Sequence, residues 1–411
     1  MKIKRFEKIC KSLNVPLSRI KFLESLIKPL NANLYMVGGV VRDLLLLKKT
    51  LTPPDLVLDL PIKSIVSILK KNKIKFSSVG IEYGSIVVHD NLLKFDLTSM
   101  RKDLLSYGRH AKVKFSKSIV DDSLRRDFTI NAIYCDTKGR IIDPQGGLKD
   151  LCALKKPKVR FIGLPEKRIF EDYLRILRFI RFSLTYSKKF NNLEFSMCEK
   201  FKNELLKLSF ERRISELERI LILENFESKN VIEKISKFIE LSLECKISPQ
   251  KFLDLCRLER KLDKISFQRR IKFLLRKKKN NNLKFLNHVN KEFKERIKVN
   301  LKFNDYSICG IFCLLYSYPK KFIIDFLFFA YVEKKISQSK LTRLLTNIDS
   351  FKKKKMPIDG NDLIKIGFRK GKLMGKILEK VKMKWIKKEF SLTKKECLSY
   401  ASSLYPTGAR R

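Results

Sequence analysis

The sequence lacks any apolar run long enough to cross a membrane. Its most apolar stretch, Phe322 to Val332, covers eleven residues and contains Asp325, whereas a spanning helix needs roughly 20 apolar residues. The segment from Met1 to Cys10 mixes charged and single apolar residues, which predicts an amphipathic helix rather than a secretory signal. We therefore expect no association with a membrane.

Acidic residues are also scarce. The 411 residues include 91 Lys or Arg but only 43 Asp or Glu, which gives a formal net charge of +48. Such a one-sided surface repels itself when compact and is neutralised by a polyphosphate chain. With 44% hydrophobic residues the chain is too apolar to be a disordered basic tail. We expect folded domains whose basic surface binds nucleic acid.

The nine cysteines include no CxxC pair. Cys309 and Cys313 are the only close pair, and no histidine lies near them in the sequence. This pattern favours ordinary thiols in a reducing cytoplasm over metal ligands or disulfides.

Glycine is missing from the middle of the chain. None occurs from Leu164 to Cys309, and Pro249 is the only proline between Glu166 and Tyr318. Because these residues break helices, this part should be almost wholly helical. Apolar residues recur there at helical spacing, at Leu174, Leu177, Ile180 and Leu184 and again at Ile214, Leu217, Ile220 and Leu221.

The N-terminal part instead predicts mixed α and β structure. Short runs rich in branched residues predict strands, and Lys138-Gly139 predicts a hairpin turn. The expected strands are Leu34–Val37, Leu56–Leu60, Ser85–Val88, Leu93–Leu97, Ile133–Cys135 and Arg140–Ile142.

The first chemical motif is a strand that ends in Gly38-Gly39 and opens a helix carrying Arg42. Backbone N–H groups at such a turn can approach phosphate oxygens closely, and the arginine adds positive charge. The same pattern also occurs in ordinary turns before helices, so both interpretations stay open here.

Acidic residues follow this turn at Asp55, Asp59 and Asp96, beside expected strands. Carboxylates at the ends of neighbouring strands can share Mg²⁺, which bridges triphosphate oxygens and lowers the pKa of an attacking hydroxyl. Isolated aspartates beside turns are more often capping residues.

A third motif places Asp172, Arg175, Arg178 and Arg181 at every third position of an expected helix. A carboxylate and a guanidinium held rigidly can read the Watson–Crick edge of a base, and further arginines can bind phosphates. A salt-bridge ladder within one helix is the alternative, and spacing alone favours it.

Together these segments resemble the bacterial class II tRNA nucleotidyltransferases, the CCA-adding enzymes that share a family with bacterial poly(A) polymerases. The matching segments follow in order along nearly the whole chain: Gly38 to Asp43, Glu82 to Ser85, Gly108 to Ala111, Arg125 to Ala132, Asp143 to Gly147, Glu171 to Arg181, Glu211-Arg212 and Pro357 to Leu363 with Trp385.

The resemblance implies an α+β fold. A small mixed-sheet nucleotidyltransferase head would occupy residues 1–150, a helical neck with the nucleotide-recognition helix 151–225, and a helical body and tail 226–411. The body and tail would bind the acceptor arm and 3′ end of tRNA, and the enzyme would use CTP, ATP and Mg²⁺ in the cytoplasm to build or repair the 3′ CCA.

The resemblance also implies roles for individual residues. The triphosphate would contact Gly39 and Arg42, the sugar and phosphates would contact Arg126 and Asp127, and Arg178 and Arg181 would bind the nucleotide further. The pair Asp172 and Arg175 would read cytosine or adenine.

The chain departs from the family where the metal ligands belong. The family carries Asp-x-Asp, and aligning it with Asp55 leaves either Pro53 at the first position or Val57 at the second. We therefore expect Asp55, assisted by Asp96, to hold the metal and carry catalysis. The alternatives are a poly(A) polymerase, or a tRNA-binding protein that kept the fold and lost its activity.

Overall fold

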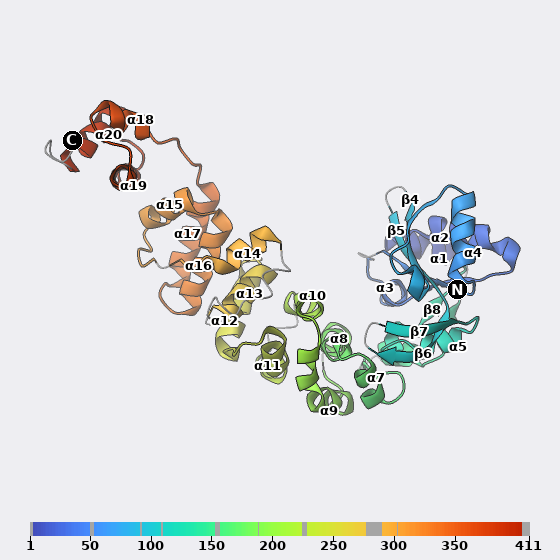
Figure 1. Cartoon of the computed structure of the whole chain (residues 1–411). Helices are drawn as coiled ribbons and strands as arrows, with labels where there is room; N and C mark the ends of the chain where they lie inside the picture. Colours follow the sequence, from blue (N-terminus) through green and yellow to red (C-terminus); the bar gives the residue numbers. More distant parts are fainter. Residues whose placement is uncertain are drawn as a thin grey trace. The chain divides into compact units, whose positions relative to one another are not determined.

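The chain folds into two compact units in the computed structural model, unit 1 (Met1–Lys246) and unit 2 (Ile247–Arg411) (Figure 1). The head, neck, body and tail boundaries expected above are finer than this division and stay a prediction. The structure describes residues 3–49, 53–90, 93–107, 110–152, 157–187, 189–223, 228–276, 290–301 and 303–404.

A mixed seven-stranded sheet is the centre of unit 1, with the strand order β3-β4-β5-β2-β1-β8-β9, and β6 pairs with β7 in a separate sheet. The strands are β1 (Leu34–Val37), β2 (Asp55–Leu58), β3 (Lys75–Ser77), β4 (Ser85–Asp90), β5 (Leu93–Ser99), β6 (Arg101–Tyr107), β7 (His110–Phe115), β8 (Tyr134–Cys135) and β9 (Ile141–Ile142). The strand predictions are confirmed to within a few residues, including the β8–β9 hairpin. The β6–β7 pair was not anticipated.

The two faces of this sheet carry different side chains, because successive residues of a strand point to opposite faces. Leu58 and Leu97 pack against α2 (Leu17–Ile27) and α4 (Ile62–Lys71) on one face. Val57 lies on the other face and packs with Met100 and Tyr134. Asp55 shares that second face, at the first residue of β2.

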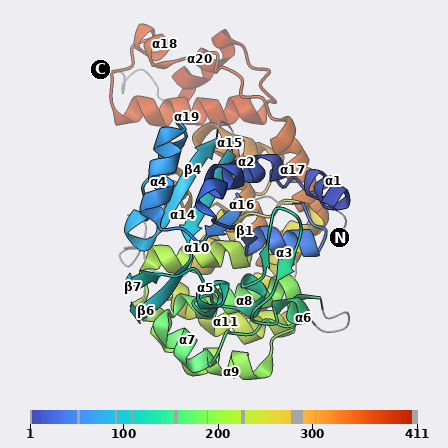
Figure 2. The same cartoon turned by 90° about the vertical axis from the view of Figure 1, so that its right-hand side faces the viewer.

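The remaining α-helices described in unit 1 include α7 to α11, which confirm the helical character of the glycine-poor segment. Figure 2 shows α8, α10 and α11 lying side by side. Leu177 and Ile180 are buried on α8 as predicted, whereas Leu174 and Ile214 are only partly buried. These helices are α1 (Ile3–Ser12), α3 (Gly39–Leu45), α5 (Ile119–Leu124), α6 (Gly147–Leu151), α7 (Pro165–Glu171), α8 (Leu174–Phe182), α9 (Asn192–Lys200), α10 (Phe210–Leu221) and α11 (Lys229–Leu243).

The secondary structure described in unit 2 consists of α-helices joined by loops. The unit's apolar helix α16 buries Asp325, and Trp385 of α19 lies in an apolar cluster with Ile358 and Leu363. The helices are α12 (Pro249–Lys261), α13 (Phe267–Leu275), α14 (Lys291–Lys298), α15 (Ile308–Ser317), α16 (Lys320–Val332), α17 (Gln338–Ser350), α18 (Gly360–Lys365), α19 (Lys372–Lys387) and α20 (Lys394–Leu404).

Across the described residues, every helix is too short or too polar to span a membrane.

Candidate active site

A cavity of about 410 Å³ in unit 1 collects most of the predicted site residues. Five arginines and three aspartates line it, so its walls carry more positive than negative charge. Its lining comprises Gly38, Gly39, Arg42, Asp55, Arg126, Asp127, Asn131, Asp172, Leu174, Arg175, Arg178, Phe182 and Arg212.

The glycine turn after β1 brings backbone close to a carboxylate. Gly38 has φ +70°, a left-handed conformation that disfavours other residues. A Cβ atom there would lie 3.4 Å from the Oδ2 atom of Asp55. Gly38 therefore lets the turn pass directly beside the first residue of β2.

Asp55 and Asp96 lie next to each other on neighbouring strands of the sheet. They are register partners on the parallel strands β2 and β5. Burial and the neighbouring charge of Asp96 raise the pKa of Asp55. Neither carboxylate forms a side-chain hydrogen bond or ion pair with any described residue. The two like charges are thus adjacent and uncompensated by a direct partner.

Asp59 does not join this pair. Its carboxylate accepts hydrogen bonds from the backbone N–H (2.8 Å) and the side-chain amide (2.7 Å) of Asn33. Asp59 therefore binds a distant residue and neither caps a helix nor joins the acidic pair, whereas Asp55 and Asp96 form no side-chain hydrogen bond with any described residue.

Arg42 is buried at the base of the cavity. Its guanidinium donates to the side-chain oxygen of Asn131 and, at 3.1 Å, to the hydroxyl of Tyr186. The rings of Phe182 and Tyr186 lie within about 5 Å of its Cζ atom, at 5.1 and 5.2 Å. The arginine is held rigidly in place, with its charge facing the cavity.

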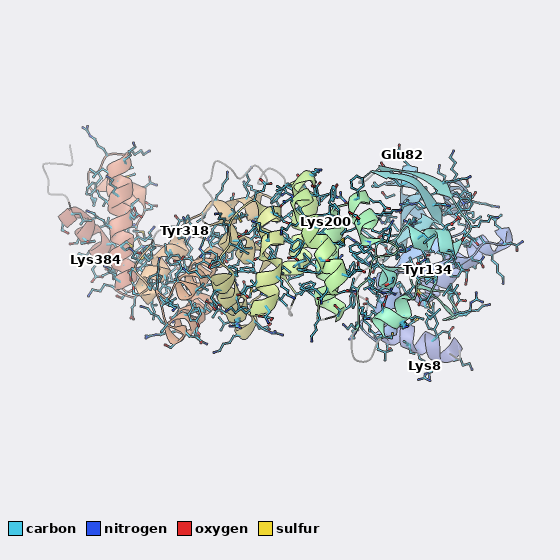
Figure 3. The ribbon with its side chains drawn as sticks, turned by 90° about the horizontal axis from the view of Figure 1, so that it is seen from below. Lys8, Glu82, Tyr134, Lys200, Tyr318 and Lys384 are labelled. Atoms are coloured by element: carbon cyan, nitrogen blue, oxygen red, sulfur yellow. The ribbon has the colours of Figure 1, made fainter. Side chains whose placement is uncertain are left out.

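Arg126 is fixed by a buried network. Its Nη2 atom donates to Asp122 at 3.0 Å, and its Nε atom donates to the hydroxyl of Tyr134 at 3.1 Å (Figure 3 labels Tyr134). Burial raises the pKa of Asp122, but Arg126 and Arg125 outweigh it and lower that pKa to about 2. Asp122 is therefore an anion that anchors two arginines.

Asp127 lies next to this network and is paired across elements. Its Oδ2 atom accepts from the Nε and Nη2 atoms of Arg178, each at 2.6 Å, and its Oδ1 atom accepts from Asn131 at 2.7 Å. Burial raises the pKa of Asp127, yet the charge of Arg178 dominates and keeps that pKa well below its usual range.

The expectation that Asp172 shares a helix with the three arginines is wrong. Asp172 lies between α7 and α8, where its backbone is extended and its carboxylate accepts from the N–H of Leu174 at 3.1 Å. Its ionic partner is Arg212 of α10, at 2.8 Å. The side chain thus binds the first residue of α8 and still lines the cavity.

A salt-bridge ladder within one helix is also wrong as a description of the arginine stripe. Arg175 donates to Glu171 of α7 at 2.5 Å, Arg178 pairs with Asp127, and Arg181 donates to Glu216 of α10 at 2.7 Å. Because the partners come from three other segments, α8 ties these segments together.

Two predicted site residues, Asp96 and Arg181, are absent from the cavity lining, although Asp96 adjoins Asp55. Two polar lining residues, Asn131 and Arg212, were assigned no role from the sequence. Both lie within segments that carry the family resemblance, which was the available signal.

Other matching segments have structural roles. Asp143 accepts from the N–H groups of Gly147 and Leu148, which caps α6. Asp359 and Asp362 form a capping box at α18. The matching residues Gly108 and Arg109 lie outside the described residues.

Known proteins match both sequence and fold. The Poly A polymerase head domain matches residues 34–156. The CCA-adding enzyme of Streptococcus uberis is 33% identical over 210 residues, which cover 49% of this chain and 48% of that protein. The CCA-adding enzyme of Ligilactobacillus salivarius is 29% identical over 369 residues, 84% of this chain and 86% of that protein. Residues 34–156 thus match the Poly A polymerase head domain, and the chain as a whole is similar to CCA-adding enzymes.

Solved structures of the family agree in fold. The Bacillus stearothermophilus CCA-adding enzyme in complex with CTP has a TM-score of 0.75 at 21% identity, over 95% of this chain and 98% of that chain. The Thermotoga maritima enzyme complexed with tRNA has a TM-score of 0.68 at 21% identity, over 98% of this chain and 99% of that chain. The α+β fold predicted from the resemblance is confirmed.

A divalent cation of the kind that the family resemblance implies fits the pair Asp55 and Asp96. Hard cations prefer carboxylate oxygens, and a cation would compensate the burial and the charge of Asp96, which together raise the pKa of Asp55. Pro53 is exposed and offers no side-chain ligand, and Val57 is buried in the apolar cluster. No group of three or more His, Cys, Asp or Glu suited to a metal occurs in the described part of the chain.

Proposed function

We propose that this chain is a tRNA nucleotidyltransferase that adds or repairs the 3′-terminal CCA of tRNA from CTP and ATP. The observation that carries the proposal is the arginine-lined cavity beside the free carboxylates of Asp55 and Asp96. A nucleoside triphosphate has the complementary charge, and its size suits a cavity of about 410 Å³.

The triphosphate would lie toward Arg42, Arg126 and Arg178. Each of these guanidiniums is held by protein acceptors before the nucleotide arrives. Prepositioned donors stabilise the charge that develops on phosphate oxygens without reorganising during the reaction.

The base would lie toward Asp172 and Arg175, with Arg212 holding the Asp172 carboxylate. An acceptor and a donor in fixed positions can distinguish the Watson–Crick edges of cytosine and adenine from those of uracil and guanine. We call Asp172 and Arg175 the base-reading wall. Arg181 would support it by donating to Glu216, which Arg178 also approaches.

In the reaction, the 3′ hydroxyl of the tRNA would lose its proton to solvent and attack the α-phosphate, a new phosphodiester bond would form, and pyrophosphate would leave with the electron pair of the broken bond. Asp55 and Asp96 would hold Mg²⁺, which when bound supplies charge neutralisation for the triphosphate. The chain's own contribution is to bind and orient the two reactants.

The RNA would bind to the basic surface of the chain. Tyr318 and Lys384, labelled in Figure 3, line a groove of about 1010 Å³ in unit 2. Lys376, Lys382 and Lys387 of α19 also line it. We place the reaction in the cytoplasm, since all nine cysteines are free thiols.

One experiment separates the candidate functions. Incorporation of α-phosphate-labelled CTP and ATP is measured on a tRNA that ends before CCA and on a poly(A) primer. CTP followed by ATP incorporation into tRNA supports the proposal, whereas ATP addition to the primer would indicate a poly(A) polymerase. Binding of tRNA without incorporation would indicate an inactive tRNA-binding protein, the alternative suggested by the missing metal ligand at Pro53 or Val57.

A further inference from the structure

We infer that Arg168, which lies outside the cavity lining, is a positioning residue that couples the sugar and phosphate contacts of the active site to its base-reading wall. The inference rests on the proposed function, and it concerns one side chain that joins two segments more than 40 residues apart in sequence.

Arg168 binds the backbone carbonyls of Arg125 and Arg126. It lies on α7, is 9% exposed, and its Nη2 atom donates to the carbonyl oxygens of Arg125 (2.7 Å) and Arg126. These carbonyls immediately precede Asp127. The position of Arg126 and Asp127 in the cavity therefore depends on this contact.

The same guanidinium also holds the base-reading wall. Its Nη1 atom donates to the Oε2 atom of Glu171, and Arg175 donates to that same oxygen. Arg175 further donates to the backbone carbonyl of Arg168 at 2.8 Å. Arg168, Glu171 and Arg175 thus form a closed set of contacts one residue away from Asp172.

The burial of Arg168 is costly. Burial lowers its pKa, the nearby charge of Arg175 lowers it further, and Glu171 offsets this only in part. An apolar residue could fill the space between α7 and the Arg125–Arg126 loop without that cost, but it could not fix both carbonyls and Glu171 together. The geometry therefore favours a role in orientation over a role in stability.

The chain offers a matched control. Arg213 of α10 is 5% exposed and likewise donates to a backbone carbonyl, that of Leu241 at 3.0 Å, and to a carboxylate, that of Glu244 at 2.8 Å. It is absent from the cavity lining. Replacing either arginine removes a similar set of contacts, but only Arg168 joins two walls of the cavity.

The experiment compares Arg168→Met and Arg168→Lys with Arg213→Met and Arg213→Lys. Equilibrium binding of CTP, ATP, UTP and GTP is measured below the melting temperature of each variant, together with kcat/KM for each nucleotide on tRNA. We expect Arg168→Met to reduce the preference for CTP and ATP over UTP and GTP about tenfold to a hundredfold, because small displacements of a reading group have effects of this size. Arg168→Lys should recover part of the preference.

Arg213→Met should lower the melting temperature and leave the preference unchanged. An equal loss for all four nucleotides in Arg168→Met, matching that of Arg213→Met, would overturn the inference. Absence of incorporation by the wild-type protein would overturn the proposed function, and the binding preferences would still test Arg168. A wild-type protein without any binding preference would overturn both.

Discussion

Units 1 and 2 each contain a cluster of arginines and carboxylates, and the clusters differ in how completely the charges are paired. In unit 2, Arg269 donates to both Glu259 and Asp325 at 2.9 Å, and Arg296 binds Asp325 through two nitrogens at 2.7 Å. All four side chains are buried. In unit 1, arginines face a cavity and two carboxylates have no described partner.

This difference separates structural charge from functional charge. A closed network of buried ion pairs holds helices in register, and it can bind nothing without being broken. An incomplete network at a cavity can accept a ligand that completes it. Residue types alone would not distinguish the two clusters, since both combine arginine with aspartate or glutamate.

The largest expected effect comes from Asp55→Asn. It should reduce nucleotide incorporation by at least about 100-fold, as the loss of one electrostatic group at a reacting centre does. The melting temperature should rise slightly. Burial and the charge of Asp96 both disfavour the ionised form of Asp55, and the substitution removes that charge. Labelled-nucleotide incorporation and thermal unfolding measure the two effects.

Asp59→Asn is the control for that variant, since Asp59 is bound to Asn33 and lies outside the cavity. It should retain incorporation. Full incorporation by Asp55→Asn would show that the alignment of this loop and the metal assignment are both wrong.

Asp325→Ala should instead lower stability and leave nucleotide binding unchanged, the reverse of what we expect for Asp55→Asn. Removing it leaves Arg269 and Arg296 buried without their shared partner, so the free energy of unfolding should fall by about 3–5 kcal/mol. Affinity for CTP should be unchanged at temperatures where the variant is folded. Urea unfolding and CTP titration give the two quantities.

The exposed pair of Asp349 with Lys264, 3.6 Å apart, provides the comparison. Asp349→Ala should change the free energy of unfolding by no more than about 1 kcal/mol. If Asp325→Ala is equally mild, the unit 2 cluster is not a closed stabilising network.

Glu194 of α9 sharpens the comparison because it is a buried carboxylate that forms no ion pair with any described residue. Burial raises its pKa from 4.5 to about 7, and Arg160 and the backbone N–H of Phe161 oppose this only in part. The folded state binds the extra proton, so this contribution to stability is present below pH 4.5 and is lost as the pH rises through about 7. Glu194→Gln should therefore be more stable than wild type at pH 8, by up to about 3 kcal/mol.

The gap should close at pH 4.5, as urea unfolding at both pH values would reveal. Glu199→Gln, exposed on the same helix, should show no such gap. A Glu194→Gln variant that is no more stable at pH 8 than at pH 4.5, relative to wild type, would contradict the pKa assigned to Glu194.

Local sequence predicted the parts of the site that depend on local structure. The run Leu34 to Val37 and the glycines after it specify a strand and a turn within a few residues, and the absence of glycine specifies helices. The break before α8 was missed although aspartate commonly begins a helix, because the apolar spacing continued through Asp172.

Pairs between distant elements could not be read from spacing. Arg212 reaches Asp172 across 40 residues, and Asp127 reaches Arg178 across 51. Which arginine meets which carboxylate depends on how α8 and α10 pack, and the packing is set by apolar residues such as Leu177 and Leu217 rather than by the charged ones. The resemblance identified the site residues, and only the fold showed which arginine pairs with which carboxylate.

The smallest expected effect comes from completing the open cluster of unit 1 by Pro53→Asp. Residue 53 precedes Asp55 by two positions and is exposed, so a carboxylate there could approach the cation that Asp55 and Asp96 would hold. Because an exposed charge interaction contributes at most about 1 kcal/mol, the Mg²⁺ concentration for half-maximal incorporation should fall about fivefold or less. Calorimetric titration with Mg²⁺ should show the same shift without any nucleotide.

Pro53→Asn is the control that separates the added charge from the change in backbone, since it also removes the proline ring but adds no carboxylate. If both variants behave alike, the ring matters rather than the missing ligand. If neither changes the Mg²⁺ requirement while wild type is active, the two carboxylates already suffice, and the departure at Pro53 has no catalytic consequence.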